Sequence, residues 1–347
     1  MKNFRKLNSN DKPICSVCIA NYNGIEYIDS CISSVINQTF LFNVEIIIHD
    51  DAPTDGSADY IQKNYPAVRL IESSMNVGFC VSNNRMAKEA AGDFLFFLNN
   101  DAILFPDALE TLYNYSLHGN SHLILSLPQY NAETCELIDI GSKFDLFLNP
   151  VPNKDKMQAK NIGMVIGACL WIPMPLWKDL GGFPEYFQSL AEDMYICCMA
   201  RLRGFQVETT PYSGFHHWVG KSIGGGKILK DRLSTLIKRR ALSERNKSYV
   251  MVICYPSPLF QLFFPIHIFL LFTEGLFLSI IKSKPDLLLS IYLFAIKSLW
   301  KKRYRLLRLR EIHQKRKTIK PHVFLKPFNF IPYKFEMLIR YGMPEIK

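Results

Sequence analysis

The chain has 347 residues and a formal net charge of +10, from 41 Lys and Arg against 31 Asp and Glu. With 48% hydrophobic and 21% charged residues, disorder is excluded for most of the chain. Residues 301–320 contain ten bases and one acid, whereas residues 1–300 are nearly neutral, with 27 bases and 28 acids. This excludes a protein that coats nucleic acid along its whole length and predicts an anionic partner for one segment.

The first hundred residues alternate between strand-like and helix-like segments. Short apolar, β-branched runs predict strands at 15–20, 44–48, 68–71 and 94–98. Apolar residues at spacings of three and four predict helices at 27–36, 58–64 and 81–91. This order predicts a doubly wound α/β sheet, in which ligands bind beyond the carboxyl ends of the strands.

The nine cysteines and the N-terminus bear on the cellular compartment. Cys15 and Cys18 have the spacing of half a zinc site, but they lie in a strand-like run where positions three apart face opposite sides. We therefore expect buried thiols in a reducing compartment. Residues 1–13 contain no apolar segment of a signal peptide, which predicts a cytosolic address.

Polar residues follow three of the predicted strands. These loops contain Asn21–Gly24, His49–Ser57 and Asn99–Asp101, rich in carboxylates and amides. Turn formation alone explains each of them, because Asp, Asn and Gly favour turns, but three at one sheet edge indicate a binding site. No glycine-rich phosphate loop follows any strand, which argues against a dinucleotide or P-loop enzyme.

The runs VCIANYN, VEIIIHDDAPTDGS, NVGFCVSNN and GDFLFFLNND resemble the nucleotide-sugar-binding half of glycosyltransferase family 2. The run GGFPEYFQSLAEDMYICCMARLRGFQV resembles its acceptor half, and the resemblance covers about residues 13–222. The NND triplet and HHWVGKS are most similar to the bacterial rhamnosyltransferase branch. The family implies a GT-A (Rossmann-like) mixed α/β sheet with flanking helices over residues 1–245. Its donor half is expected at about 13–105 and its acceptor half at about 106–245.

The resemblance implies a donor site at the strand ends. An aromatic ring there stacks on a nucleobase, and a carboxylate accepts the N3–H of uracil or thymine. The loop at Lys221 and Ser222 is expected to close over the diphosphate; its alternative is a surface linker. The donor-binding residues implied are Ala20, Tyr22, Asp50, Asp51, Asn76, Gly78, Asn84, Asn99, Asn100, Lys221 and Ser222.

Asn99-Asn100-Asp101 occupies the position of the family's DxD motif, whose carboxylates hold Mg²⁺ or Mn²⁺. Asn99 replaces the first Asp, so Asp101 is expected to be the principal ligand, with Asn99 and His216 completing the set. His217 is the second choice, because neighbours in an extended segment face opposite ways.

Glu192-Asp193 precedes a helical apolar run. The resemblance implies that Asp193 is the general base that takes the proton from the acceptor hydroxyl, while Glu192 orients it, binds the acceptor or caps the helix. The alternative for the pair is helix capping alone, since acidic residues stabilise a helix N-terminus.

Residues 250–273 contain no Asp, Glu, Lys or Arg, and this uncharged stretch is long enough to span a bilayer. However, Pro256, Pro258 and Pro265 interrupt it. We therefore expect residues 246–347 to form a mainly α-helical, membrane-associating region whose helices lie in the interface. The basic segment would face anionic lipid at the cytoplasmic face of the inner membrane. A dimerisation bundle and an ordinary core helix are the alternatives.

Together these features predict inverting transfer of a sugar from dTDP-rhamnose or a UDP-hexose to a lipid-linked glycan of bacterial envelope polysaccharide or O-antigen synthesis. One alternative is a sugar-phosphate nucleotidylyltransferase, although its glycine-rich loop is missing. The other is a non-enzymatic scaffold that binds membrane or nucleic acid. No nucleic-acid partner is expected, and the oligomeric state is left open.

Overall fold

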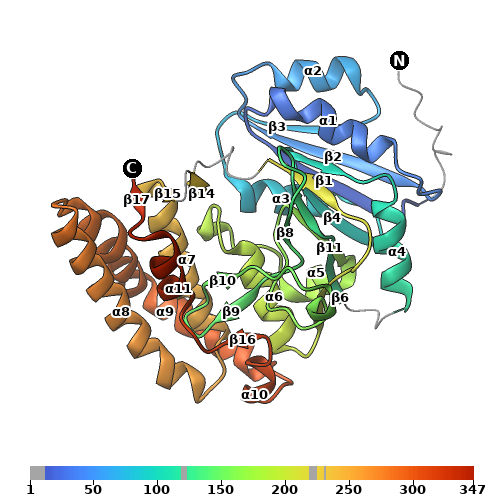
Figure 1. Cartoon of the computed structure of the whole chain (residues 1–347). Coiled ribbons are helices and arrows are strands. Elements are labelled where there is room, and N and C mark those ends of the chain that lie inside the picture. Colours follow the sequence, from blue (N-terminus) through green and yellow to red (C-terminus); the bar gives the residue numbers. More distant parts are fainter. Residues whose placement is uncertain (1–11, 119–122, 219–224, 230–231) are drawn as a thin grey trace.

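A computed structural model describes residues 12–118, 123–218, 225–229 and 232–347 (Figure 1). At its centre is a seven-stranded sheet of order β12-β6-β11-β4-β1-β2-β3. Its strands are β1 (Cys15–Asn21), β2 (Val44–Asp51), β3 (Arg69–Ser73), β4 (Phe94–Asn99), β6 (Leu123–Ser126), β11 (Cys169–Pro173) and β12 (Gln206–Thr209). All four strands expected from the apolar runs are present, and β2 continues three residues further, through Asp51.

The sheet is mixed, as the sequence predicts. β1 pairs in parallel with β2 and with β4, and β2 pairs in parallel with β3. β11 lies antiparallel between β4 and β6. The carboxyl ends of β1, β2 and β4 therefore meet at one edge, where the polar loops follow them.

Helices cover both faces of the sheet. One hydrophobic cluster contains buried residues of α1 and α4, and the other contains those of α3, α5 and α6. The bounds are α1 (Ile25–Ile36), α2 (Ser57–Asn64), α3 (Phe79–Glu89), α4 (Ala108–His118), α5 (Met174–Leu180) and α6 (Glu192–Leu202), with short helical turns η1 (Lys156–Gln158) and η2 (Glu185–Phe187). Cys15 and Cys18 belong to opposite clusters, as the strand prediction requires. Cys135 is exposed, unlike the other eight cysteines.

Three smaller sheets connect the remaining segments. In the first, β13 lies antiparallel to β5 and parallel to β7, which brings the two adjacent histidines beside the chain that follows Asp101. Its strands are β5 (Ala102–Leu104), β13 (Phe215–His217), β7 (Gln129–Asn131) and β8 (Leu137–Asp139). The others contain β9 (Lys143–Asp145), β10 (Pro150–Val151) and β16 (Phe328–Asn329), and β14 (Gly225–Leu229), β15 (Arg232–Thr235) and β17 (Glu345–Ile346).

The C-terminal third is mainly helical and packs beside the sheet domain, with α8 at the outer edge (Figure 1). Its elements are α7 (Ile237–Cys254), α8 (Leu259–Ile281), η3 (Leu288–Leu293), α9 (Phe294–Lys315), α10 (Pro321–Phe324) and α11 (Tyr333–Tyr341). Residues 249–255 are buried in the same cluster as α6. The expected boundary at residue 245 thus falls inside α7. The first six residues of the 250–273 stretch form protein core and do not face a membrane.

Candidate active site

A chain of hydrogen bonds joins the ends of β1, β2 and β4. The Asn21 amide nitrogen donates to Asp50 Oδ1 at 2.9 Å, and the Asn100 amide nitrogen donates to Asn21 Oδ1 at 2.6 Å. Asp50 Oδ2 accepts from Ser57 Oγ, and burial raises the pKa of the Asp50 carboxyl. A Cβ at Gly24 would lie 2.1 Å from the Asn100 amide nitrogen and 2.2 Å from Asn21 Oδ1, so any other residue there would displace this chain of hydrogen bonds. The strand ends converge as the sequence predicts, and the side chains of Asp50 and Asn100 hold them together through hydrogen bonds with Asn21.

Asp51 orders the loop that precedes α3. Its two carboxylate oxygens accept hydrogen bonds from the backbone N–H groups of Val77 and Gly78, at 2.7 and 2.8 Å. Gly78 has a φ of 87°, a conformation that favours glycine. Tyr22, which follows β1 directly, is 52% exposed.

Three further predicted donor-binding residues differ in their surroundings. Ala20 is half-buried at the end of β1, and Asn76 is exposed. Asn84 uses its amide within the protein, because it accepts from the Phe183 N–H at 3.0 Å and donates to the Phe183 carbonyl at 2.9 Å. Its observed role is to hold α3 against the segment before η2. Lys221 and Ser222 lie outside the described residues.

Asp101 is 3% exposed and pairs with His217, not with His216. His217 Nε2 lies 3.1 Å from Asp101 Oδ1, and the Gln129 amide nitrogen lies 2.8 Å from His217 Nδ1. An amide nitrogen only donates, so Nδ1 accepts and Nε2–H donates to the carboxylate. His216, on the other side of β13, packs against the rings of Phe105 and Tyr130. The expectation for His216 is corrected here, because the alternation of β13 points the second histidine at Asp101.

The residues at the NND triplet fit a hard divalent cation. Asp101 Oδ2 and Asn99 Oδ1 are buried, and neither has a hydrogen-bond partner among the described residues. Carboxylate and amide oxygens suit Mg²⁺ or Mn²⁺, and such an ion takes further ligands from water and substrate phosphates. In the part of the chain that the structure describes, no cluster of three or more His, Cys, Asp or Glu side chains could hold the ion by itself.

The acidic pair opens α6 in its first turn, as predicted. Asp193 Oδ2 accepts from the Gly167 N–H at 3.0 Å, and the adjacent Ala168 carbonyl accepts from the Asn99 N–H at 3.0 Å. Two consecutive residues therefore join the acidic pair to the end of β4. Burial raises the pKa of both carboxyl groups, and Glu192 is raised further by the charge of Asp193.

A cation that the sequence analysis missed stands near the pair. Arg239, in the first turn of α7, interacts electrostatically with Glu192 and Asp193 and lowers the pKa of both. Burial lowers the pKa of the Arg239 guanidinium itself, while the two carboxylates raise it. No local motif marks this arginine, because it lies 46 residues beyond Asp193 and reaches the site only through the packing of α7 on α6.

Comparison with known proteins gives consistent matches. The family model described as Glycosyl transferase family 2 matches residues 16–180. The chain is 36% identical over 132 residues to the uncharacterized glycosyltransferase YibD of Escherichia coli (strain K12), covering 37% of this chain and 36% of that protein. It is 34% identical over 210 residues to a poly(ribitol-phosphate) beta-glucosyltransferase of Bacillus spizizenii, covering 59% of this chain and 32% of that protein. The chain thus matches about a third of the length of these two relatives.

Two solved structures resemble this chain over most of its length. Staphylococcus aureus TarS 1-349 in complex with UDP superposes with a TM-score of 0.55 at 17% identity, covering 87% of this chain and 86% of that one. GalNAc-T7 with UDP, GalNAc and Mn²⁺ superposes with a TM-score of 0.60 at 16% identity, covering 96% and 59%. At these identities the likeness establishes the shared fold, which is the GT-A arrangement that the sequence predicts.

Proposed function

Because residues 16–180 form a glycosyltransferase family 2 domain on a GT-A fold, we propose that this protein transfers a sugar from a nucleoside diphosphate-sugar to an acceptor hydroxyl. One observation carries the proposal. The segment Gly167–Ala168 bonds Asp193 with one residue and Asn99 with the next. This supports the proposal, because neighbouring residues of one segment bond the Asp193 carboxylate and the end of β4, the strand after which the family binds the diphosphate.

In the proposed reaction the acceptor oxygen attacks the anomeric carbon from the face opposite the diphosphate. The new carbon–oxygen bond forms as the bond to the phosphate oxygen breaks, and Asp193 takes the hydroxyl proton. The nucleoside diphosphate leaves and the anomeric centre inverts. A bound Mg²⁺ or Mn²⁺ would neutralise charge on the leaving diphosphate. Asp101 and Asn99 would hold that ion, and the His217 N–H would orient the Asp101 carboxylate.

Similar proteins support a choice of donor. Both similar structures hold UDP and the Bacillus relative is named a glucosyltransferase, which favours a UDP-hexose, with dTDP-rhamnose second. The same relative is named for poly(ribitol-phosphate), which favours a glycan or polyol-phosphate acceptor of the bacterial envelope. A lipid-linked O-antigen remains the second acceptor. The nucleotidylyltransferase alternative has no comparable support.

The donor is tested by thermal shift and nucleotide release across UDP-glucose, UDP-N-acetylglucosamine, UDP-galactose and dTDP-rhamnose, with and without Mn²⁺. We expect at least one donor to raise Tm in a Mn²⁺-dependent way, because a ligand that binds only the folded state stabilises it by mass action. The variant Asp101→Asn should lose the Mn²⁺-dependent part. Absence of any shift and of any nucleotide release across the panel would overturn the proposed function.

We also propose that the C-terminal region attaches the enzyme to an anionic membrane surface on its cytosolic side. In α8, Phe269 is 66% and Ile280 is 68% exposed, and apart from Gln261 the other exposed residues of this helix are also apolar. The sole Asp, Glu, Lys or Arg of α8 is Glu274, and it is paired internally with Arg240 and Lys334. α8 is long and apolar enough to cross a membrane.

The opposite face of α8 packs on the rest of the protein. This favours a helix that lies in the membrane interface over one that crosses the membrane. Leu271 and Leu278 on that face are buried against η3 and α7. The neighbouring α9 supplies exposed bases, including Lys301, Arg305 and Arg308, which attract anionic headgroups.

A further inference from the structure

The segment immediately before the acidic pair has an unusual backbone. Gln188, Leu190 and Ala191 have φ values of 68°, 72° and 63°, and none of them is glycine. Each such residue carries a backbone cost and persists only where its surroundings hold it. Ala191 is the N-cap residue of α6, and no side chain caps that helix end. Something outside the segment must therefore stabilise it.

Asn246, in the middle of α7, supplies that contact. Its amide nitrogen lies 3.0, 2.9 and 2.8 Å from the carbonyl oxygens of Phe187, Ser189 and Leu190. The side chain is fully buried, so these bonds are shielded from water. One side chain thus contacts three carbonyl groups within four consecutive residues of the strained segment.

Arg245 fixes the direction of the Asn246 amide. Its Nε donates to Asn246 Oδ1 at 2.9 Å, and its Nη2 donates to the Phe187 carbonyl at 2.9 Å. Because the amide oxygen accepts from the guanidinium, the amide NH₂ group must face the segment. The orientation of Asn246 therefore follows from its neighbour.

The segment is also bonded to the start of α3, just after the loop at Val77 and Gly78 that Asp51 holds, called the donor loop from here on. The Gln188 carbonyl accepts from the Cys80 N–H at 3.0 Å, at the start of α3. A Cβ at Gly78 would lie 3.2 Å from that carbonyl oxygen. The strained segment lies between that loop and α7, and Asp193 lies two residues beyond its last residue, Ala191.

We propose that Asn246, oriented by Arg245, is a positioning residue that sets the place of the Asp193 carboxylate at the reacting centre. This inference rests on the proposed function, since it assigns a residue to that reaction. Asn246 lies outside the family match at residues 16–180, and this role makes α7 part of the catalytic apparatus. The C-terminal region then has a second role besides attachment.

The test replaces Asn246 with Leu, whose side chain branches at the same carbon but has no hydrogen-bonding group, so the bonds are removed. We expect kcat to fall by about 10²-fold, the effect of a misplacement of about 1 Å, with the donor Kd within about twofold, because the donor loop keeps its Asp51 bonds. Ser248→Ala is the matched control: it is equally buried on α7, but its hydroxyl contacts the Glu244 carbonyl and His267. We expect wild-type kcat for it.

A rescue separates positioning from folding. Ala191→Gly removes the backbone cost at that residue, so adding it to Asn246→Leu should recover kcat several-fold. If Asn246→Leu does not fold, Asn246→Ser is measured in the same way. Amide exchange of Tyr195, whose N–H bonds the Ala191 carbonyl, should be faster in the Asn246 variant, and this readout does not need activity.

The outcomes distinguish the two proposals. Wild-type kcat and unchanged Tyr195 exchange in a folded Asn246 variant, alongside an inactive Asp193→Asn, would overturn the positioning role and leave the proposed function intact. A wild-type enzyme that uses no nucleotide-sugar, with faster Tyr195 exchange in the variant, would overturn the proposed function but keep the structural coupling.

Discussion

Asp193 differs from a helix-capping carboxylate in its hydrogen bonds. One oxygen accepts from the next residue of its own helix, Met194, and the other accepts from Gly167 on the loop before β11. The N-cap position itself is Ala191, which has no capping side chain. The helix-capping alternative thus explains one of its two bonds. Glu192 leaves a buried oxygen without a partner among the described residues, which suits an acceptor hydroxyl.

The pH profile of kcat should reflect the buried environment of Asp193 and Glu192. The base must be ionised, and burial raises the pKa of Asp193 and of Glu192. Activity should therefore fall as pH drops through apparent pKa values of the pair that lie above the ordinary carboxyl range of about 4. We expect Glu192→Gln to move this acid limb to lower pH by removing a like charge, and Arg239→Gln to move it to higher pH by removing a cation. An acid limb that stays in place in both variants would contradict the assignment.

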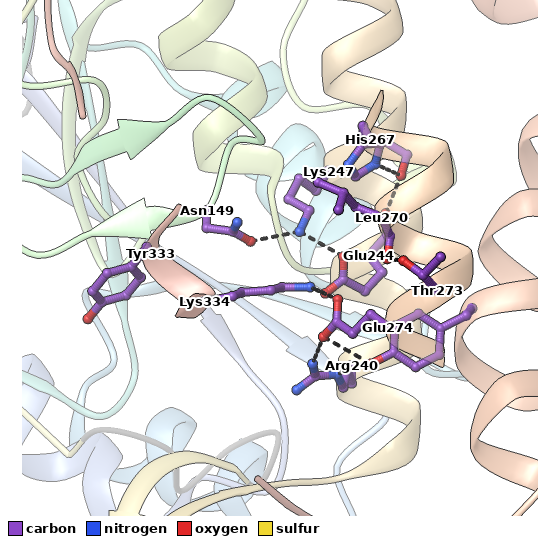
Figure 2. Close-up of polar contacts among 12 residues, drawn as sticks. Asn149, Arg240, Glu244, Lys247, His267, Leu270, Thr273, Glu274, Tyr333 and Lys334 are labelled. Atoms are coloured by element: carbon purple, nitrogen blue, oxygen red, sulfur yellow. Dashed lines mark hydrogen bonds and ion pairs between the residues drawn. The ribbon is translucent and has the colours of Figure 1, made fainter. Parts of the chain in front are cut away.

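At the scale of elements, α7 connects the active site to a buried network of charges. Figure 2 shows side chains from α7, α8 and α11 meeting there. Lys334 Nζ lies 2.5 Å from Glu244 Oε1 and 2.7 Å from Glu274 Oε2, and Lys247 lies 2.7 Å from Glu244. Arg240 pairs with Glu274 at 2.5 Å. The network ties the proposed membrane helix, α8, to α7, the helix proposed to position the base.

Glu244→Gln should destabilise the fold strongly. It leaves the buried Lys247 without its carboxylate, and the loss of one partner of a buried ion pair costs about 3–5 kcal/mol. Glu311→Gln is the control: Glu311 pairs with Lys315 on the surface, where such pairs contribute about 0–1 kcal/mol. Urea unfolding measures both. Equal midpoints for the two variants at unchanged m would show that the network adds no stability.

The fold was predictable where burial leaves a local pattern. Short apolar runs predicted β1, β2 and β4, because strands buried on both faces are apolar throughout. β3 lies at the sheet edge and is partly exposed, and only its central apolar residues gave a signal. The extension of β2 was not predictable, because Asp50 and Asp51 interrupt the apolar run. Their carboxylates are stabilised by hydrogen bonds from residues distant in sequence: Asn21, Val77 and Gly78.

The site was predictable to the same extent. Strand-end residues were found because a parallel sheet gathers them at one edge. The alternation of the two histidines was expected, but which of them faces Asp101 depends on how β13 pairs with β5. Arg239 and Asn246 had no local signal, because a single polar residue in a helix takes its role from what the helix packs against.

The whole molecule combines a nearly neutral sheet domain with a basic, apolar helical region. The two share a hydrophobic core through α6 and α7, so the proposed attachment and the proposed catalysis would be mechanically linked. Not all of the basic segment is available to lipid: Arg310 is buried and donates to the Val252 carbonyl at 2.9 Å. The remaining exposed bases of α9 and the apolar face of α8 form the proposed attachment surface.

Attachment is measured by sedimentation of the full chain with vesicles. We expect binding to vesicles that contain phosphatidylglycerol, weaker binding to pure phosphatidylcholine, and loss of the difference at high salt, because salt screens the bases. Phe269→Glu with Ile280→Glu should abolish binding, whereas Met157→Glu, at a residue 89% exposed on η1, should leave it unchanged. A chain that stays in the supernatant with anionic vesicles at low salt would contradict attachment.

The central claim is that Asp193 is the base of a sugar transfer, and acceptor-dependent release of nucleoside diphosphate at saturating donor tests it most directly. Asp193→Asn keeps the shape but cannot take a proton, so release should fall by at least about 10²-fold while the donor Kd stays unchanged. Asp59→Asn is the control, because Asp59 is an exposed acid in the first turn of α2 and its variant should keep wild-type release. Release by Asp193→Asn within a few-fold of wild type would contradict the account.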